Sequence, residues 1–392
     1  MKPTWGRIGA LALAWLAIVV AGCGSSSSQP GDAGVTHDFQ HPVDLLPPPP
    51  DLAPPLRDAG DHPPPPSVAS GGGPVLHHVD LVTVTWSGDP DAQDRADFGS
   101  WIVTSNYYDL LAEYGVMRGT ARGPFAITTP PPANLDDGEV GALLRGRIAA
   151  KELPPPAPET LYVVYLPAGT TSTLDGSHGC EAYGGYHHFT SSFLGGATPW
   201  LVYAIIPSCA GGVDSERITV SHEVVEAVTE PREGGWRDPA LPYGELGDLC
   251  TSLSYFDVAA GYSVTRFWSK QNADAGTLDP CVPVPAPPYV YFNAALDPEE
   301  SLLSLDDTGK GTVVVQIEPF AMGAVGRIAW RINTFGAPGI SFVPSSGSGV
   351  PGSTTPVTIK ASALAQPGYY PIWISATAKT WNNVWYGSLT VQ

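Results

Sequence analysis

The sequence predicts two folded domains of different class: an α+β domain over residues 74–284 and an all-β sandwich of the immunoglobulin type over residues 285–392. In the first region, apolar runs typical of buried strands alternate with segments of helical spacing. After the linker at 283–288, only short alternating strands separated by glycine and proline remain. The chain has 392 residues, which is enough for both domains and an N-terminal extension.

The first 23 residues are interpreted as an export signal. Lys2 and Arg7 precede the apolar run 8–20, which is too short for an ordinary membrane-spanning helix. The run ends in Val-Ala-Gly-Cys at 20–23, which resembles the bacterial lipobox. That resemblance implies that Cys23 is lipidated and anchors the chain to the bilayer of the bacterial cell envelope. Because no aspartate follows Cys23, an outer-membrane or cell-surface location is favoured. An ordinary secretory signal with a chance cysteine is the alternative.

Residues 24–73 are expected to form a disordered, proline-rich tether. They contain the proline runs 47–50 and 63–66 and few apolar residues, so that no core can form. The Ser-Gly-Gly-Gly sequence at 70–73 is expected to be a flexible joint between this tether and the folded part.

The cysteines predict two disulfides. Apart from Cys23 there are four cysteines, and an even number in an exported chain favours pairing. Of the three possible connectivities, we favour Cys180–Cys209 and Cys250–Cys281, because each closes a loop of about thirty residues. A zinc site made of these four is disfavoured, since none lies in a Cys-x-x-Cys pair. The net charge of −19 disfavours nucleic acid as a partner.

The expected elements of the two domains follow from the periodicity. In the first domain, residues 167–198 and most of 234–283 are expected to be irregular, and Asp214 or Ser215 is expected to cap a helix that Pro231 ends. The expected strands of this domain are 79–86, 161–166 and 200–206, and the other expected helices are 91–114 and 136–151. The strands expected in the sandwich are 313–317, 327–332, 340–343, 357–361, 370–377 and 384–391.

The helix before Pro231 contains His-Glu-Val-Val-Glu at 222–226. His222 and Glu226 are four residues apart, so they share a helix face and can both reach one cation. Glu223, between them, has the sequence position of a general base. The competing interpretation is that Glu223, Glu226 and Glu230 form a solvated acidic face.

A catalytic zinc site needs a third protein ligand. We rank Glu245 and Asp248 first together, because both follow the helix in Gly-Glu-Leu-Gly-Asp at 244–248. His187 and His188, upstream of the helix, are the alternatives. Zn²⁺ is the expected metal, although a histidine with two carboxylates also suits other divalent cations.

A family resemblance covers residues 160–281. The segments that carry it are the strand 161–166, the Cys180 loop with His187 and His188, the Tyr203 strand leading to Cys209, the His-Glu-x-x-Glu helix with Pro231, and Gly-Glu-Leu-Gly-Asp-Leu-Cys followed by Trp268 and Cys281. In order and spacing they resemble the phosphate-induced protein/Exordium family of plants and its bacterial relatives. The resemblance implies a secreted, zincin-like α+β domain with a metallopeptidase-like helix. Plant members look like cell-wall growth regulators, and membership does not imply an activity. The sequence departs from the family pattern in three features: Thr229-Glu230 before Pro231, the lipobox and the sandwich.

Together these observations predict a surface lipoprotein whose first domain is a zinc-dependent peptidase, or a degenerate relative of one, acting on a peptide or a cell-wall polymer. The alternative is a non-catalytic binding protein for polysaccharide or a partner protein, because exposed aromatic rings suit sugar faces. The chain has 11 tryptophans and 16 tyrosines. Trp381, Trp385 and Tyr386 are the first candidates for such binding. The sandwich itself is expected to be a spacer or docking domain.

Overall fold

The computed structural model describes residues 65–191, 200–285, 289–334, 337–379 and 381–392. Within these ranges no helix is long and apolar enough to cross a membrane. The predicted signal, the lipidation of Cys23 and most of the predicted tether fall on residues 1–64, which lie outside the described residues. The described residues all belong to one compact unit.

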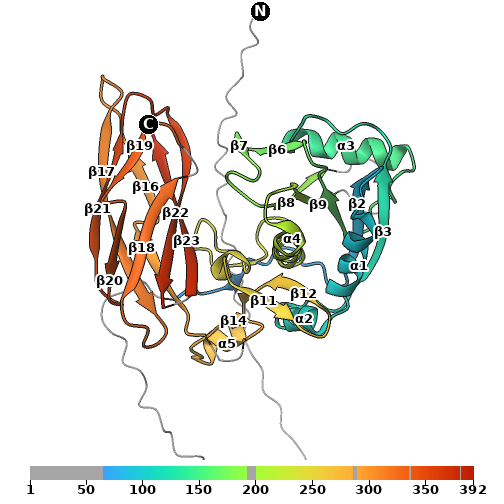
Figure 1. Cartoon of the computed structure of the whole chain (residues 1–392), viewed down its shortest axis with the longest axis horizontal. Coiled ribbons are helices and arrows are strands. Elements are labelled where there is room, and N and C mark those ends of the chain that lie inside the picture. Colours follow the sequence, from blue (N-terminus) through green and yellow to red (C-terminus); the bar gives the residue numbers. More distant parts are fainter. Residues whose placement is uncertain (1–64, 192–199, 286–288, 335–336, 380) are drawn as a thin grey trace, which may run out of the picture. The chain divides into compact units, whose positions relative to one another are not determined.

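A five-stranded mixed sheet organises the first domain (Figure 1). Its first four strands are parallel and the edge strand β8 is antiparallel to β9. All residues of β5 are buried, as are nearly all of β2 and β9, which explains the continuous apolar runs of β5 and β9. In spatial order the strands are β3 (Thr120–Ile127), β2 (Asp80–Trp86), β5 (Thr160–Tyr165), β9 (Trp200–Ile206) and β8 (Tyr186–Ser191).

Helices cover both faces of this sheet (Figure 1). Side chains alternate along each strand, so neighbouring residues enter different cores. Leu161 and Val163 of β5 pack in one core with residues of α1 (Ala92–Ile102) and α4 (Gly212–Thr229). Tyr162 and Val164 pack in the other core with residues of α3 (Asp137–Ala149).

The expected helix over 91–114 is wrong as a single element. It is divided into α1, α2 (Asn106–Asp109) and a 3-10 turn η1 (Leu110–Tyr114). The division falls at Ser105, which has extended backbone angles and whose hydroxyl accepts the backbone N–H of Tyr108 at 3.2 Å. A serine that satisfies a backbone donor in this way begins a new helix instead of continuing the old one.

The segment 167–198 is also more regular than expected. It contains β6 (Thr171–Leu174) and β7 (Ser177–His178), which form a small sheet with β4 (Asn134–Asp136), and it ends in β8 of the main sheet. Residues 192–199 lie outside the described ranges. The strand β8 matters most for function because it carries His187.

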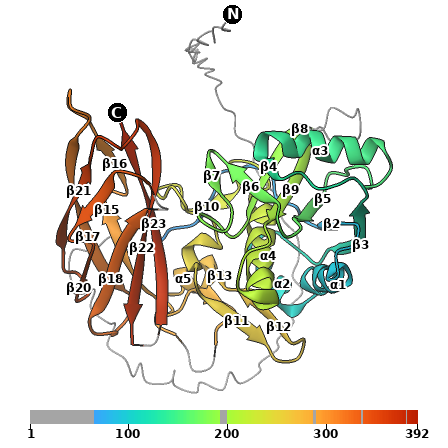
Figure 2. The same cartoon turned by 45° about the horizontal axis from the view of Figure 1, so that its top comes forward.

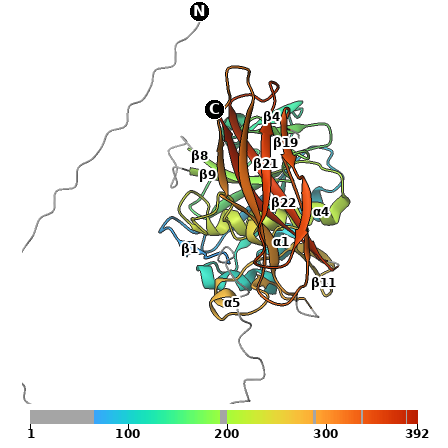
Figure 3. The ribbon, with the colours of Figure 1, turned by 90° about the vertical axis from the view of Figure 1, so that its left-hand side faces the viewer.

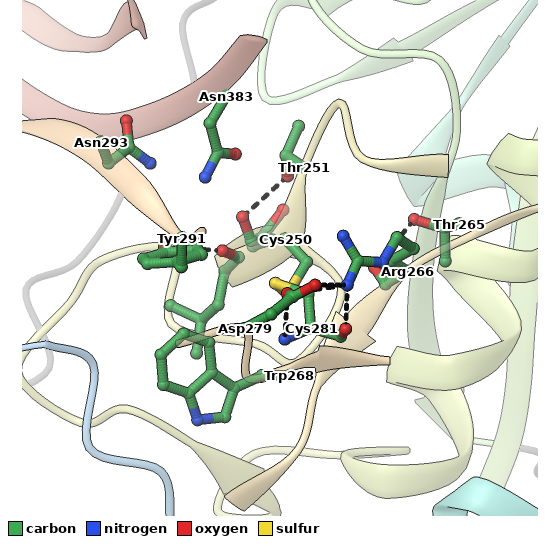
Figure 4. Close-up of a disulfide and its surroundings, with 12 residues drawn as sticks. Cys250, Thr251, Thr265, Arg266, Trp268, Asp279, Cys281, Tyr291, Asn293 and Asn383 are labelled. Atoms are coloured by element: carbon green, nitrogen blue, oxygen red, sulfur yellow. Dashed lines mark hydrogen bonds and ion pairs between the residues drawn. A yellow bond between two sulfur atoms is a disulfide. The ribbon is translucent and has the colours of Figure 1, made fainter. Parts of the chain in front are cut away.

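Between α4 and the sandwich the chain forms only short helices and strands, as expected. In the view of Figure 2 this segment passes below α4. Both predicted disulfides are confirmed: Cys180–Cys209 and Cys250–Cys281. Figure 4 shows the second one beside Arg266 and Asp279. The short elements here are β10 (Trp236–Arg237), η2 (Asp248–Cys250), β11 (Ser254–Asp257), β12 (Tyr262–Thr265), β13 (Phe267–Trp268), α5 (Lys270–Asp274) and β14 (Cys281–Val282).

The predicted tether is shorter than expected at its C-terminal end. β1 (Ala69–Ser70) pairs with β10, and the backbone N–H groups of Gly71 and Gly73 donate to the carbonyls of Gly235 and Gly234 at 2.9 and 2.6 Å. The Ser-Gly-Gly-Gly sequence is therefore docked on the segment that follows α4. The glycines fit because a Cβ on either would lie within 2.7 Å of the Gly234 carbonyl oxygen.

The expected C-terminal β-sandwich is confirmed, with two packed sheets whose long strands run side by side (Figure 3). In β18 buried and exposed residues alternate strictly, which is the pattern of a sheet with one face in a core. One sheet has the order β15 (Phe292–Asp297), β17 (Gly311–Ala321), β21 (Thr355–Ala361) and β19 (Ile340–Val343). The other has the order β16 (Glu300–Leu303), β23 (Trp381–Val391), β22 (Gly368–Ala378), β18 (Ile328–Thr334) and β20 (Ser346–Gly349).

Candidate metal centre

The second half of α4 is buried and brings the predicted motif into the interior. Glu223, Glu226 and Glu230 are each only 3–4% exposed, so the interpretation as a solvated acidic face is wrong. Gly211 precedes the first turn and no side chain caps it; Asp214 lies within that turn, so the expected cap at Asp214 or Ser215 is also wrong. An acidic residue in the first turn still stabilises the helix, because its negative charge interacts favourably with the positive end of the helix dipole.

One group of three donors joins the helix to the loop after it. Nε2 of His222 lies 3.1 Å from Oε1 of Glu226 and 3.5 Å from Oδ1 of Asp248. Ligand atoms of these three residues lie within 4.8 Å of one another. The backbone N–H of Asp248 also donates to Oε1 of Glu226 at 3.1 Å, which fixes η2 against the helix. Asp248, rather than Glu245, therefore completes the group that His222 and Glu226 begin.

A second group forms around His187, which enters the cluster from β8. Its Nδ1 lies 3.6 Å from Oε2 of Glu223 and 3.6 Å from Oε2 of Glu226. Its Nε2 lies 3.4 Å from Oε1 of Glu245. His187, Glu223 and Glu226 offer ligand atoms within 4.8 Å of one another. Glu245 is thus at the site, but as a neighbour of His187.

His188 does not belong to the centre. Because side chains alternate along a strand, it lies on the other face of β8, with Nε2 3.7 Å from Oδ2 of Asp137. Its side chain is 46% exposed, against 11% for His187. Of the two alternative histidines, only His187 is brought to the motif helix.

Two glycines allow the backbone to approach the donors closely. A Cβ on Gly247 would lie 2.8 Å from Oε1 of Glu226 and 2.8 Å from Nδ1 of His222. A Cβ on Gly185 would lie 3.1 Å from Oε1 of Glu223. These distances are too short for any other residue type at Gly247 without displacing the donors. Gly247 is thus explained by the site, whereas a Cβ on Gly244 would meet the backbone of Asp238.

Burial and mutual repulsion raise the pKa values of some carboxyl groups in the cluster. The pKa of Asp248 is raised to about 7, first by burial and then by the charge of Glu226. Burial also raises the pKa of Glu223. Burial acts in the same direction on Glu226, but His222 and His187 outweigh it and lower the pKa of Glu226 to about 2. Burial opposes protonation of both histidines, yet their carboxylate neighbours raise the pKa of each well above 6.5.

These shifts predict that the metal-free protein loses stability as the pH rises from about 5 to about 8. Folded Asp248 keeps, up to about pH 7, a proton that the unfolded chain releases near 3.8, so its contribution is lost over that interval. The raised pKa values of His187 and His222 act in the same direction above 6.5. Within this cluster Glu226 acts oppositely, and its contribution is lost as the pH falls from 4.5 to about 2.

Urea unfolding in the presence of a chelator, at several pH values, measures this dependence. Because a cation competes with these protons, added zinc is expected to stabilise the protein more at about pH 8 than at about pH 5. An unfolding free energy that increases over this range without metal would contradict the predicted protonation of the cluster.

The donor set fits a divalent cation of the zinc type. Imidazole nitrogen and carboxylate oxygen are both zinc ligands, and the donors come from three separated segments, β8, α4 and η2. The side chains of His222, Glu226 and Asp248 are 19%, 4% and 14% exposed, so the group is enclosed but reachable from solvent. Among the described residues this is where groups of three such donors occur.

The aromatic residues proposed for polysaccharide binding differ in exposure. Trp385 is 4% exposed and belongs to the apolar core, so it is wrong as a surface candidate. Trp381 is 36% exposed and packs on Tyr289, with ring centroids 4.9 Å apart. Tyr386 is partly buried and packs on Tyr243 of the first domain at 5.2 Å. Trp381 is thus the most exposed of the three.

No protein-family model and no curated protein matches the chain. Among solved structures it is similar to WR4, a C. elegans MSP family member, with 12% identity and a TM-score of 0.22 over 25% of this chain and 97% of that one. The ASH/PapD-like domain 7 of human CEP192 shows 10% identity and a TM-score of 0.21 over 25% of this chain and 83% of that one. A similarity of this extent defines neither the fold nor the function of the chain.

Proposed function

We propose that the first domain is a zincin-like, zinc-dependent peptidase and that Cys23 anchors it to the cell envelope as a lipoprotein. The observation that carries the proposal is the group His222, Glu226 and Asp248, whose ligand atoms lie within 4.8 Å of one another beside a buried Glu223. A catalytic zinc site has three protein ligands and a fourth position that is left for water. When bound, Zn²⁺ supplies Lewis-acid polarisation of a carbonyl group and activates water near neutral pH.

In this proposal the chain's own residues orient the reactants and move the proton. His222, Glu226 and Asp248 would hold the cation, and the backbone N–H of Asp248 keeps the Glu226 carboxylate in place. Glu223, one residue from the first ligand, accepts a proton from the attacking water and returns it to the leaving amine. Burial raises its pKa, which is the direction that favours a general base.

The position of β8 favours an extended peptide as the substrate class. Among the described strands, β8 is at the edge of the main sheet, so a peptide in extended conformation can add to it through backbone hydrogen bonds. His187 extends from this strand to the motif helix. A peptide that pairs with β8 would therefore pass the cation-binding group.

The two disulfides support a location outside the cytoplasm, where such bonds form and persist. The second candidate function remains a non-catalytic surface binding protein for polysaccharide or a partner protein. The observation that favours it is the partly exposed Trp381 on β23, packed against Tyr289. In that case the sandwich would bind the ligand and the first domain would have a structural cation.

Metal content and hydrolysis, measured on the same full-length protein in detergent, distinguish these functions. After zinc loading and desalting, the protein is expected to retain zinc by elemental analysis, and Asp248→Asn is expected to lower the affinity at least about tenfold. Cleavage of a broad peptide library would support the peptidase. Zinc retention without any cleavage would favour the binding protein, and failure to retain zinc would overturn the metal centre.

A further inference from the structure

The two carboxylate oxygens of Glu226 face different groups. Oε1 lies 3.1 Å from Nε2 of His222 and accepts the backbone N–H of Asp248 at 3.1 Å. Oε2 lies on the side of His187, 3.6 Å from its Nδ1. A carboxylate with this orientation can bind one cation through each oxygen. Glu226 is therefore placed as a bridge between two sites rather than as a ligand of one.

The second group has the composition of a metal site and not merely of an acidic cluster. It combines the imidazole of His187 with the carboxylates of Glu223 and Glu226, and the three side chains are 11%, 6% and 4% exposed. The histidine comes from a strand and the carboxylates from a helix, so the sheet and the helix together define its geometry.

The environment of the other nitrogen of His187 supports this assignment. A histidine that binds metal through one ring nitrogen commonly donates its other N–H to a carboxylate, which orients the ring. Nε2 of His187 lies 3.4 Å from Oε1 of Glu245, on the side away from the motif helix. Glu245, which is left out of the first group, thereby has a defined role as a positioning residue for His187.

Charge balance also favours two cations. Glu223, Glu226, Glu245 and Asp248 bring four negative charges when ionised, and one divalent cation would leave two of them unbalanced in a largely buried cluster, or one if His187 is protonated. Unbalanced buried charge is costly. Two divalent cations would balance the four carboxylates with both histidines neutral.

We propose that His187, Glu223 and Glu226 bind a second divalent cation, that Glu226 bridges the two cations, and that Glu245 positions His187. This deepens the proposed function and rests on its first cation site. One consequence concerns the chemistry: a Glu223 carboxylate that binds the second cation no longer accepts a proton. Filling the second site therefore inhibits the proposed hydrolysis, so its dependence on zinc concentration passes through a maximum.

Zinc stoichiometry of the tag-free, full-length protein tests the proposal without an activity assay. Calorimetric titration with zinc and elemental analysis after desalting are expected to give two zinc ions for the parent and one for His187→Ala. Glu245→Gln is expected to retain the donors but weaken the second binding event about 10–100-fold. His188→Ala is the matched control, because it removes a histidine from the other face of the same strand, and it is expected to bind two.

The outcomes separate this proposal from the first site. One zinc in the parent that Asp248→Asn abolishes and His187→Ala leaves unchanged would overturn the second site and keep the first. One zinc that only His187→Ala abolishes would overturn the bridge and the ligand set of the first site. No zinc in the parent would overturn both. Near-ultraviolet circular dichroism of each variant shows whether it is folded, so that loss of zinc can be separated from unfolding. If His187→Ala does not fold, Glu245→Gln provides a second test.

Discussion

Replacing Glu223 with glutamine is expected to lower the rate of peptide hydrolysis about 10²–10⁴-fold, the usual contribution of a general base. The residue is 4% exposed, and its Oε2 lies 3.6 Å from Nδ1 of His187, which is also 3.6 Å from Oε2 of the proposed ligand Glu226. Glutamine has nearly the same shape but cannot accept the proton. Initial rates at one zinc per chain, with zinc content measured on the same samples, give the comparison.

The matched control is Glu230→Gln. Glu230 is equally buried, at 4% exposure, and lies about two turns beyond Glu223, at the C-cap of α4. Its Oε1 accepts the backbone N–H groups of Gly234 and Gly235 at 2.8 and 3.2 Å, so its role is to hold the chain after α4. This variant is expected to change stability and not the rate per zinc-loaded molecule. If Glu223→Gln were as active as Glu230→Gln, the base would not be Glu223.

Local periodicity was enough to predict the parts of the centre that lie on one element. The spacing of His222 and Glu226 depends only on the helical repeat, and α4 presents both to the same group. The disulfides were predictable for a similar reason, because loop length favours sequential pairs. In the sandwich, the alternation of β18 and β21 gave the strands directly, whereas the short strands β16 and β20 have too few residues for a pattern.

The other parts of the centre depend on contacts between segments that are distant in the sequence, and a local sequence pattern does not predict such contacts. His187 reaches the helix only because β8 pairs antiparallel with β9 and turns this residue, and not His188, toward α4. The aromatic and β-branched residues of the Tyr-His-His-Phe-Thr segment were the available signal for a strand, but the segment lies in glycine-rich surroundings, which favoured a prediction of irregular structure. Asp248 and Glu245 were indistinguishable for the same reason: the turn η2 decides which of them meets His222.

Replacing Asp279 with alanine is expected to lower the free energy of unfolding by about 3–5 kcal/mol, the cost of leaving one partner of a buried ion pair uncompensated. Arg266 is 1% exposed, and its Nη2 donates to both carboxylate oxygens of Asp279 at 2.7 Å. Its Nε and Nη2 also donate to the carbonyls of Pro283 and Cys281, which cannot neutralise the charge, and its buried Nη1 has no hydrogen-bond partner among the described residues. Figure 4 shows the pair beside the Cys250–Cys281 disulfide, next to the strand that leads to the sandwich.

Asp274→Ala is the control, because it removes an exposed aspartate from the same region of the chain. Asp274 pairs with Lys270 at 2.5 Å, but the two side chains are 64% and 38% exposed, and such surface pairs contribute about 0–1 kcal/mol. Urea unfolding followed by tryptophan fluorescence measures both variants, and buried Trp268 lies close to the pair (Figure 4). Equal losses for the two variants would mean that solvent reaches Arg266. A large loss for Asp279→Ala alone would show that one buried charge pair stabilises the segment between α4 and the sandwich.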